Sequence, residues 1–292
     1  MRIDLHTHSR ASDGTQSPAE LVQAAVDAGL DVLGLTDHDT AEGWAEAVEA
    51  AERTGLTLVR GMEVSTRLDG RGVHLLAYLP DPTHPGLDEH LRRVLEGRRS
   101  RVPAIVERLA AVGIDISEDD VARVNHHSAA SGRPHVADAL VAAGVVPDRA
   151  TAFRDLLNPG RPAYVDRYAA PLREVVPVVA DAGGVTVIAH AWGRRTDRFP
   201  DAETIAELAD LGLTGLEVDH QDHPPQAREA LRGIARDLDL VVTGSSDHHG
   251  LGKVDHELGC NTTAPEELER LLDAAARAAR ASGREVPEVV SP

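Results

Sequence analysis

The amino-acid sequence predicts an α/β protein made of βα units, with a helix-only segment inserted near the middle of the chain. Short apolar segments alternate with amphipathic helical segments over most of the 292 residues, as in proteins with a parallel sheet. Histidine or carboxylate residues follow most of these apolar segments. Because active sites of α/β barrels form at the carboxyl ends of the strands, this pattern favours a barrel enzyme.

The first part of the chain gives the clearest element boundaries. Ser17-Pro18-Ala19-Glu20 combines an N-cap serine, a proline at the first helical position and a glutamate at the third, which form a capping box. The helix that follows is expected to end at Gly29. The expected elements of this part are strand 2–8, helix 18–28, strand 32–36, helix 41–54, strand 57–60 and a hairpin whose second strand covers 73–79.

Prolines at positions 80, 82 and 85 then interrupt the alternation. We predict that residues 81–162 form a helical insertion and that residues 1–80 and 163–285 form the barrel. Helices are expected at 87–113, 117–125, 134–143 and 147–157 within the insertion. The barrel is then expected to resume with strand 163–165, helix 172–182, strand 185–189, helix 202–211, strand 215–218, helix 225–238, strand 240–243 and helix 265–282.

Composition and charge exclude several classes of function. The formal net charge of −18 disfavours binding to duplex DNA or to an anionic membrane surface. No apolar run reaches the roughly 18 residues that a membrane-spanning helix needs, and the polar N-terminus lacks a signal-peptide pattern. The single cysteine, Cys260, cannot form an internal disulfide, so we expect a cytoplasmic protein. The oligomeric state is left open.

Metal-binding side chains recur at the ends of the expected strands. His6 and His8 occupy alternate positions of one strand, so both imidazoles point to the same side and can chelate one divalent ion. Imidazole and carboxylate groups without thiolates favour Mn, Fe or Zn, and so many ligands imply two or three ions. The predicted metal ligands are His6, His8, Asp13, His38, Glu63, His74, His190, Asp247 and His249.

Several motifs taken together resemble the PHP (polymerase and histidinol phosphatase) superfamily. These motifs are His6-Thr-His8, Ser12-Asp13-Gly14-Thr15, Leu35-Thr36-Asp37-His38-Asp39, Gly61-Met62-Glu63, His74, Ala189-His190 and Ser246-Asp247-His248-His249-Gly250. The resemblance implies a distorted (β/α)7 barrel with a trinuclear metal centre, for which Mn²⁺ is the first expectation. One departure is Ala191, where relatives often have proline after the histidine.

The resemblance also implies how the ligands divide among the ions. The first ion would be bound by His6, His8, Glu63 and Asp247, the second by Glu63, His74 and His190, and the third by Asp13, His38 and His249. The groups expected to act in catalysis are His6, His8, Glu63, Asp247 and His190. Asp37 and Asp39, on either side of His38, are expected to orient ligands.

The expected insertion carries two motifs that are similar to one branch of the superfamily, Ser131-Gly-Arg133-Pro-His135-Val136 and Asn158-Pro-Gly-Arg161-Pro-Ala-Tyr-Val165. Members of that branch remove the 3′-phosphate of nucleoside 3′,5′-bisphosphates and trim short RNA from its 5′ end. The similarity implies that Arg133, His135 and Arg161 bind the phosphate that is not cleaved. Arg161 stands where relatives often have lysine. Arg194 and Arg195 are weaker candidates because of their position after His190.

The sequence therefore predicts a metal-dependent phosphohydrolase in which a metal-activated hydroxide attacks phosphorus. The expected partners are a small phosphorylated nucleotide or short RNA. The general acid is left open between His135 and metal-coordinated water. Three alternatives also stay open: a histidinol-phosphate phosphatase, a DNA-proofreading exonuclease, and a non-catalytic scaffold that only binds metal.

Overall fold

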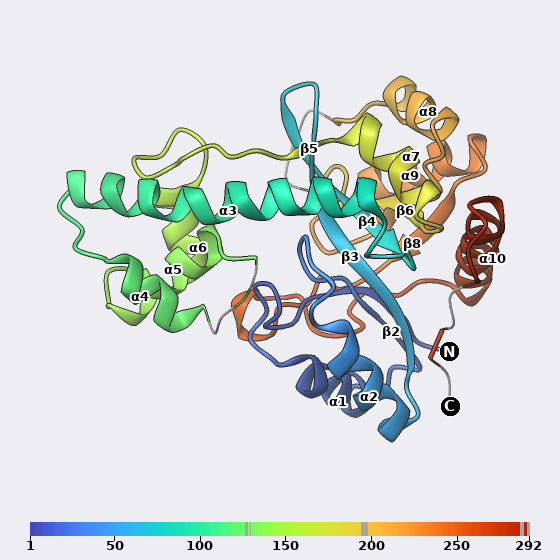
Figure 1. The fold of residues 1–292 in the computed structure, drawn as a ribbon, viewed down its shortest axis with the longest axis horizontal. Helices are drawn as coiled ribbons and strands as arrows, with labels where there is room; N and C mark the ends of the chain where they lie inside the picture. The colour runs from blue at the N-terminus through green and yellow to red at the C-terminus, as the bar shows by residue number, and fades with distance from the viewer. Residues whose placement is uncertain (126–127, 129, 194–197, 287–288, 291–292) are drawn as a thin grey trace.

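The computed structural model describes residues 1–125, 128, 130–193, 198–286 and 289–290. Within these ranges, one mixed sheet curls into a nearly closed barrel (Figure 1). Its main strands lie in the spatial order β1 (Ile3–Thr7), β2 (Val32–Leu35), β3 (Thr57–Leu68), β4 (Arg71–Tyr78), β6 (Val185–Ile188), β7 (Gly215–Asp219) and β8 (Val241–Gly244). The short strand β5 (Ala170–Pro171) pairs with β3.

The barrel closes between β1 and the segment that follows β8. Thr7 forms a parallel bridge with His248, and the His8 N–H donates to the His248 carbonyl at 2.9 Å. Closure therefore takes place at the rim where the metal-binding residues were expected, so the first and last strands of the barrel present their side chains next to each other.

Two features of the sheet correct the sequence-based expectation. The antiparallel pairing of β4 with β3 is the expected hairpin, but β4 also runs antiparallel to β6, which makes the sheet mixed, and the expected strand 57–60 continues unbroken to Leu68. The expected strand at 163–165 is wrong. Ala163 is instead fully buried against the helices of the insertion, and the chain rejoins the sheet only at Ala170.

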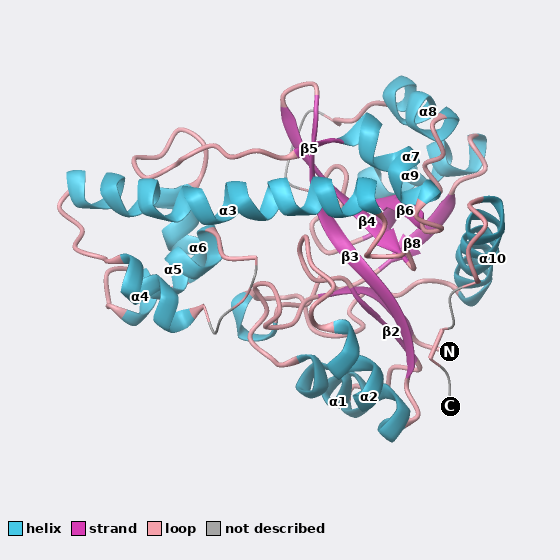
Figure 2. Ribbon diagram, in the orientation of Figure 1, coloured by secondary structure: helices cyan, strands magenta, loops and turns pink. Residues whose placement is uncertain are grey.

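Helices cover the outside of the barrel, as the βα pattern predicts (Figure 2). They are α1 (Pro18–Asp27), α2 (Trp44–Thr54), α7 (Leu172–Asp181), α8 (Ala202–Asp210), α9 (Pro225–Asp237) and α10 (Pro265–Ala281). The capping box at Ser17 and Glu20 is formed. A large apolar cluster fills the space between these helices and the sheet, whereas α10 packs with residues from the beginning of the parallel strands, such as Val185 and Val241.

The helix-only segment begins with α3 (Pro85–Ala111), which extends well beyond the barrel in Figure 1. It continues with α4 (Glu118–Val124), α5 (Arg133–Ala142), α6 (Arg149–Ala152) and a π-helical turn (Phe153–Leu157). These elements have an apolar cluster of their own, which includes Ile105, Leu109 and Leu140. The exact domain limits of 81–162 stay a prediction. In the described part of the chain, no helix has the length and apolar character needed to cross a membrane.

Candidate metal centre

All nine predicted metal ligands lie at one rim of the barrel. β1 carries His6 and is followed directly by His8, β3 carries Glu63 and β4 carries His74, while the others follow the ends of β1, β2, β6 and β8. Eight of them are buried, and His74 is half-buried. The nine side chains come from six strands but meet in one place, as the strand-end argument predicts.

The first group consists of His6, His8, Glu63 and Asp247. The Nε2 atoms of the two histidines lie 3.0 Å apart. They are 3.3 and 3.2 Å from Glu63 Oε2, and 3.4 and 3.3 Å from Asp247 Oδ1. Four ligand atoms bound tetrahedrally at about 2.1 Å from one ion lie about 3.4 Å from each other. The separations in the structure therefore fit a divalent ion.

Glu63 connects this group to a second one through its other oxygen. Oε1 lies 2.6 Å from His74 Nδ1 and 3.1 Å from His190 Nε2. His38 Nδ1 lies 3.1 Å from Oε2. Because its two oxygens face different sets of imidazoles, Glu63 has the geometry of a carboxylate that bridges two ions.

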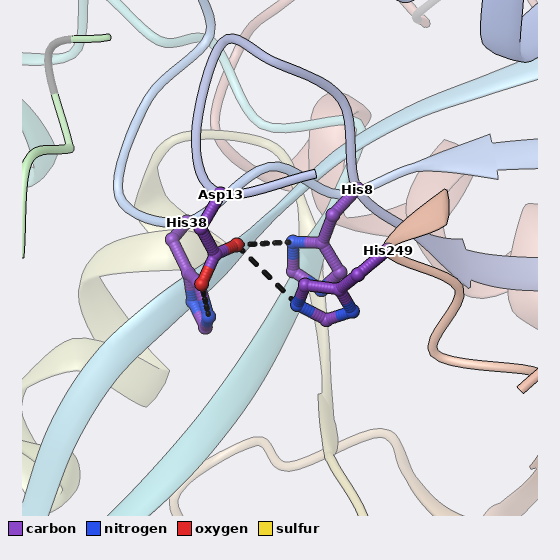
Figure 3. A group of neighbouring side chains, drawn as sticks. All are labelled: His8, Asp13, His38 and His249. Atoms are coloured by element: carbon purple, nitrogen blue, oxygen red, sulfur yellow. Dashed lines mark ion pairs between the residues drawn. The ribbon is translucent and has the colours of Figure 1, made fainter. Parts of the chain in front are cut away.

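The third group consists of Asp13, His38 and His249, with His8 alongside (Figure 3). Asp13 Oδ1 lies 3.3 Å from His249 Nε2 and 3.9 Å from His8 Nδ1, and Asp13 Oδ2 lies 3.7 Å from His38 Nε2. Burial lowers the pKa of His38 to about 3, so its imidazole is neutral and can bind a metal.

Unpartnered polar atoms support the same conclusion. Asp247 Oδ1 and His38 Nδ1 are buried and have no hydrogen-bond partner. The His6 Nδ1–H donates to Glu217, so in a neutral His6 ring the Nε2 atom carries a lone pair directed at His8. Buried acceptors that face one another need a cation between them. The donor set of imidazoles and carboxylates suits Mn, Fe or Zn.

Buried carboxylates behind the ligands hold the ligand-bearing loops. Asp37 accepts from the Ser9 N–H at 2.8 Å and from the hydroxyls of Ser9 and Ser12 at 2.6 Å, which fixes the turn before Asp13. Asp39 accepts from the Ser65 N–H at 2.6 Å. The sequence predicted an orienting role for both aspartates, and these contacts are of that kind.

Two residues that contact Asp247 and His6, Lys253 and Glu217, were not predicted from the sequence. Lys253 donates to Asp247 Oδ2, and His220 Nε2 lies 3.4 Å from the same oxygen, which leaves Oδ1 facing His6 and His8. Glu217, fully buried on β7, accepts from His6 Nδ1 at 3.0 Å. A glutamate inside an otherwise apolar strand was the available signal for Glu217, since a buried carboxylate needs a partner.

A cluster of four arginines adjoins the metal centre, formed by Arg98 and Arg101 of α3, Arg133 of α5 and Arg167. Arg98 donates to Asp39 Oδ2 at 2.7 Å and to Ser65 Oγ at 2.9 Å. Since Asp39 follows His38 directly, this contact joins the cluster to the metal rim. Burial and the neighbouring arginines lower the pKa of Arg101 and of Arg167 to about 9.

Within this arginine cluster, the described hydrogen bonds and ion pairs join Arg98 to a carboxylate but include no carboxylate partner for Arg101 or Arg167. Arg167 donates to the Ser65 hydroxyl and the Tyr168 carbonyl, which are neutral. Arg101 is 5% exposed, faces the Tyr164 ring at 5.4 Å, and has a buried Nε without a hydrogen-bond partner. Such an arrangement favours a bound anion.

The residues predicted to bind substrate lie in different surroundings. Arg133 belongs to the arginine cluster, since Arg101 and Arg167 both face its charge. Both ring nitrogens of His135 are engaged, Nδ1 by the Gly132 N–H at 3.2 Å and Nε2 by the Ser12 carbonyl at 3.1 Å. Arg161 is exposed. The roles predicted for His135 and Arg161 stay predictions, while Arg194 and Arg195 lie outside the described residues.

The mixed α/β barrel and its buried histidine–carboxylate groups define a metal-dependent phosphoesterase, and comparison with known proteins agrees. Residues 4–112 match the family model described as the PHP domain. A 3′,5′-nucleoside bisphosphate phosphatase of Chromobacterium violaceum is 34% identical over 263 residues, which cover 90% of this chain and 92% of that protein. The chain therefore belongs to the PHP family.

Two further relatives extend this comparison. A 5′-3′ exoribonuclease of Haemophilus influenzae is 33% identical over 248 residues, covering 85% of this chain and 90% of that protein. A crystal structure from Bifidobacterium adolescentis, assigned to the metal-dependent phosphoesterases, superposes with a TM-score of 0.89 at 39% identity and covers 93% of this chain and 96% of its own. The fold predicted from the sequence is confirmed.

Proposed function

We propose that the protein removes the 3′-phosphate of nucleoside 3′,5′-bisphosphates and also accepts short RNA with a 5′-phosphate. The observation that carries this proposal is the arginine cluster beside the metal-binding groups. A substrate with one phosphate needs only the metal rim, whereas a second, positively charged site beside it suits a second phosphate. The names of the relatives from Chromobacterium and Haemophilus support the same substrate class.

Each group of residues has a distinct part in the proposed reaction. Divalent ions, for which we propose Mn²⁺, would supply a water of lowered pKa and stabilise negative charge on the phosphoryl oxygens. His6, His8, Glu63 and Asp247 would hold the first ion, and His74 and His190 the second, with Glu63 shared. Asp13, His38 and His249 would hold the third.

The arginine cluster would bind and orient the phosphate that stays on the product. Arg101 and Arg167 lack carboxylate partners among the described hydrogen bonds, so an incoming phosphate would not have to displace a bound carboxylate. Charge-assisted hydrogen bonds of this kind contribute about 1.5–3 kcal/mol each. One such contact would therefore change kcat/KM by roughly 10- to 150-fold.

The test compares phosphate release, with Mn²⁺, from adenosine 3′,5′-bisphosphate, adenosine 3′-monophosphate and histidinol phosphate. The expected preference is for the bisphosphate, by at least about tenfold in kcat/KM. Arg133→Ala should reduce that preference while leaving the monophosphate rate unchanged. Arg236→Ala, an exposed arginine of α9 whose partner is Asp237, is the matched control.

The other outcomes select the alternative functions. Equal rates with the two adenosine nucleotides, unaffected by Arg133→Ala, would refute the proposed substrate. A preference for histidinol phosphate would identify the rival phosphatase. A chain that retains less than two metal ions would fit the non-catalytic scaffold. Arg161→Ala, assayed in parallel, tests the remaining sequence-based prediction, since an exposed Arg161 has to move to reach a substrate.

A further inference from the structure

β7 differs from the other main parallel strands because none of the nine predicted ligands lies on it or directly after it. The parallel strands β1, β2, β6 and β8 all carry or precede a ligand. β7 instead places Glu217 behind the metal rim, with its side chain fully buried. What this carboxylate contacts therefore determines what β7 contributes to the site.

Glu217 contacts three of the ligand-bearing segments at once. Oε1 accepts from His6 Nδ1 at 3.0 Å and from the Ser245 hydroxyl, and Oε2 accepts from the His190 N–H at 2.6 Å. Ser245 lies just before the segment that carries Asp247. One carboxylate thus connects the ends of β1, β6 and β8.

Each of these contacts fixes a property that metal binding requires. The contact with His6 selects the tautomer that leaves Nε2 free to bind an ion. The contact with His190 holds a backbone with a φ of +29°, a value that residues other than glycine rarely adopt. The third contact fixes the start of the segment that leads to Asp247. These ligands belong to the first and second groups, and no hydrogen bond or ion pair described for Glu217 reaches Asp13, His38 or His249 of the third.

We infer that Glu217 is a positioning residue that couples the first and second metal sites, so that both are lost together when its carboxylate is displaced. This inference rests on the metal centre of the proposed function but not on the identity of its substrate. Asp37 offers the counterpart for the third site. It is equally buried and has three contacts as well, but they fix the turn that presents Asp13.

The experiment measures bound Mn²⁺ per chain by equilibrium dialysis and elemental analysis, without any measurement of turnover. Glu217→Gln removes the charge at constant shape. Glu217→Asp keeps the charge, but its side chain is one methylene shorter, so the carboxylate lies farther from His6. Both variants should lower the affinity for two of the ions by about 10- to 100-fold, the usual effect of losing such an orienting group. Asp37→Asn should lower the affinity for one ion, and the double variant Asp37→Asn with Glu217→Asp should lower the affinity for all three.

Several results would overturn the inference. Wild-type metal content in Glu217→Asp, with a uniform loss in Glu217→Gln, would mean that only the charge matters. Loss of a single ion in both Glu217 variants would mean that the two sites are independent. A wild-type content below two ions would overturn the metal centre and the inference together, whereas failure of the phosphatase assay would leave the metal counts as they are.

Folding of the variants is checked by circular dichroism and thermal unfolding. If neither Glu217 variant folds, the wild-type chain provides a second measurement, because a histidine Nδ1 proton held by a buried carboxylate exchanges slowly with water. With ¹⁵N-labelled histidine, the wild-type spectrum should contain one such proton signal that is missing from the spectrum of His6→Ala. Its absence from the wild-type spectrum would overturn the inference.

Discussion

Replacing Arg101 with methionine is expected to make the protein more stable and at the same time weaken its binding of phosphate. Arg101 is 5% exposed, and its Nε has no hydrogen-bond partner. A pKa lowered from 12.5 to about 9 corresponds to about 5 kcal/mol, at about 1.4 kcal/mol for each pH unit. This value is an upper bound on the cost of keeping the side chain charged.

The expected net gain is smaller, because surrounding groups relax around the charge. Methionine has a similar length and is apolar, and replacing buried charges by apolar groups commonly raises the free energy of unfolding by about 1–4 kcal/mol. We therefore expect Arg101→Met to raise it by about 1–3 kcal/mol in urea unfolding, with metal removed by a chelator. Arg99→Met, an exposed position on the same helix, should change it by less than about 0.5 kcal/mol.

The effect of inorganic phosphate on stability shows whether the charge of Arg101 binds an anion or is only tolerated in the fold. Phosphate should stabilise the wild-type chain, since a ligand that binds the folded state raises the free energy of unfolding. It should stabilise Arg101→Met much less. The reasoning would be refuted if Arg101→Met destabilised the protein, or if phosphate stabilised both chains equally.

Three more predictions concern the metal rim and its connection to α3. His6→Ala should lower the rate of phosphate release at least about 100-fold, which is the usual effect of losing one preorganised charge-stabilising group. The circular dichroism spectrum should stay unchanged, and an unfolded or fully active variant would contradict this prediction. Burial opposes protonation of His8, but Asp247 and Glu63 raise its pKa to about 9, so in the metal-free chain a proton competes with the ion. Affinity for Mn²⁺, measured by calorimetry, should therefore rise from pH 6.5 to 9 with proton release; a flat profile would argue against it. Asp39→Asn leaves the buried Arg98 without its carboxylate and should lower the free energy of unfolding, measured in urea, by about 3–5 kcal/mol. Adding Arg98→Met to Asp39→Asn should recover part of this stability.

The meeting of the nine candidate metal ligands could be predicted because each of them follows or belongs to a strand, and strand ends meet at one edge. The period of two places His6 and His8 on one side without any knowledge of the fold. The arginine cluster could not be predicted in the same way. Arg98 and Arg101 are one helical turn apart on α3, a spacing equally typical of a solvent-exposed face. Only the packing of α3 against the barrel decides that they face inward.

The errors in the fold have the same origin. The sequence predicts the hairpin of β3 and β4, which are joined by a tight turn at Asp69 and Gly70, but the alternation of strands and helices does not indicate that β4 also runs antiparallel to β6. At 163–165, the apolar sequence favours a strand that the structure does not contain. Its hydrophobic residues contact helices of the insertion instead, with Ala163 buried among them, and burial alone does not specify which partner a segment has.

The contact between Asp39 and Arg98 has a consequence for the choice of substrate. Asp39 is covalently adjacent to His38, a proposed metal ligand, and Arg98 belongs to the cluster that would bind the second phosphate, so the two proposed anion sites cannot move apart independently. The distance between the two phosphates of a substrate should therefore determine whether both sites can bind it at once. In a series of bisphosphates in which only the linker between the phosphates is lengthened or shortened, turnover should have a maximum at one linker length.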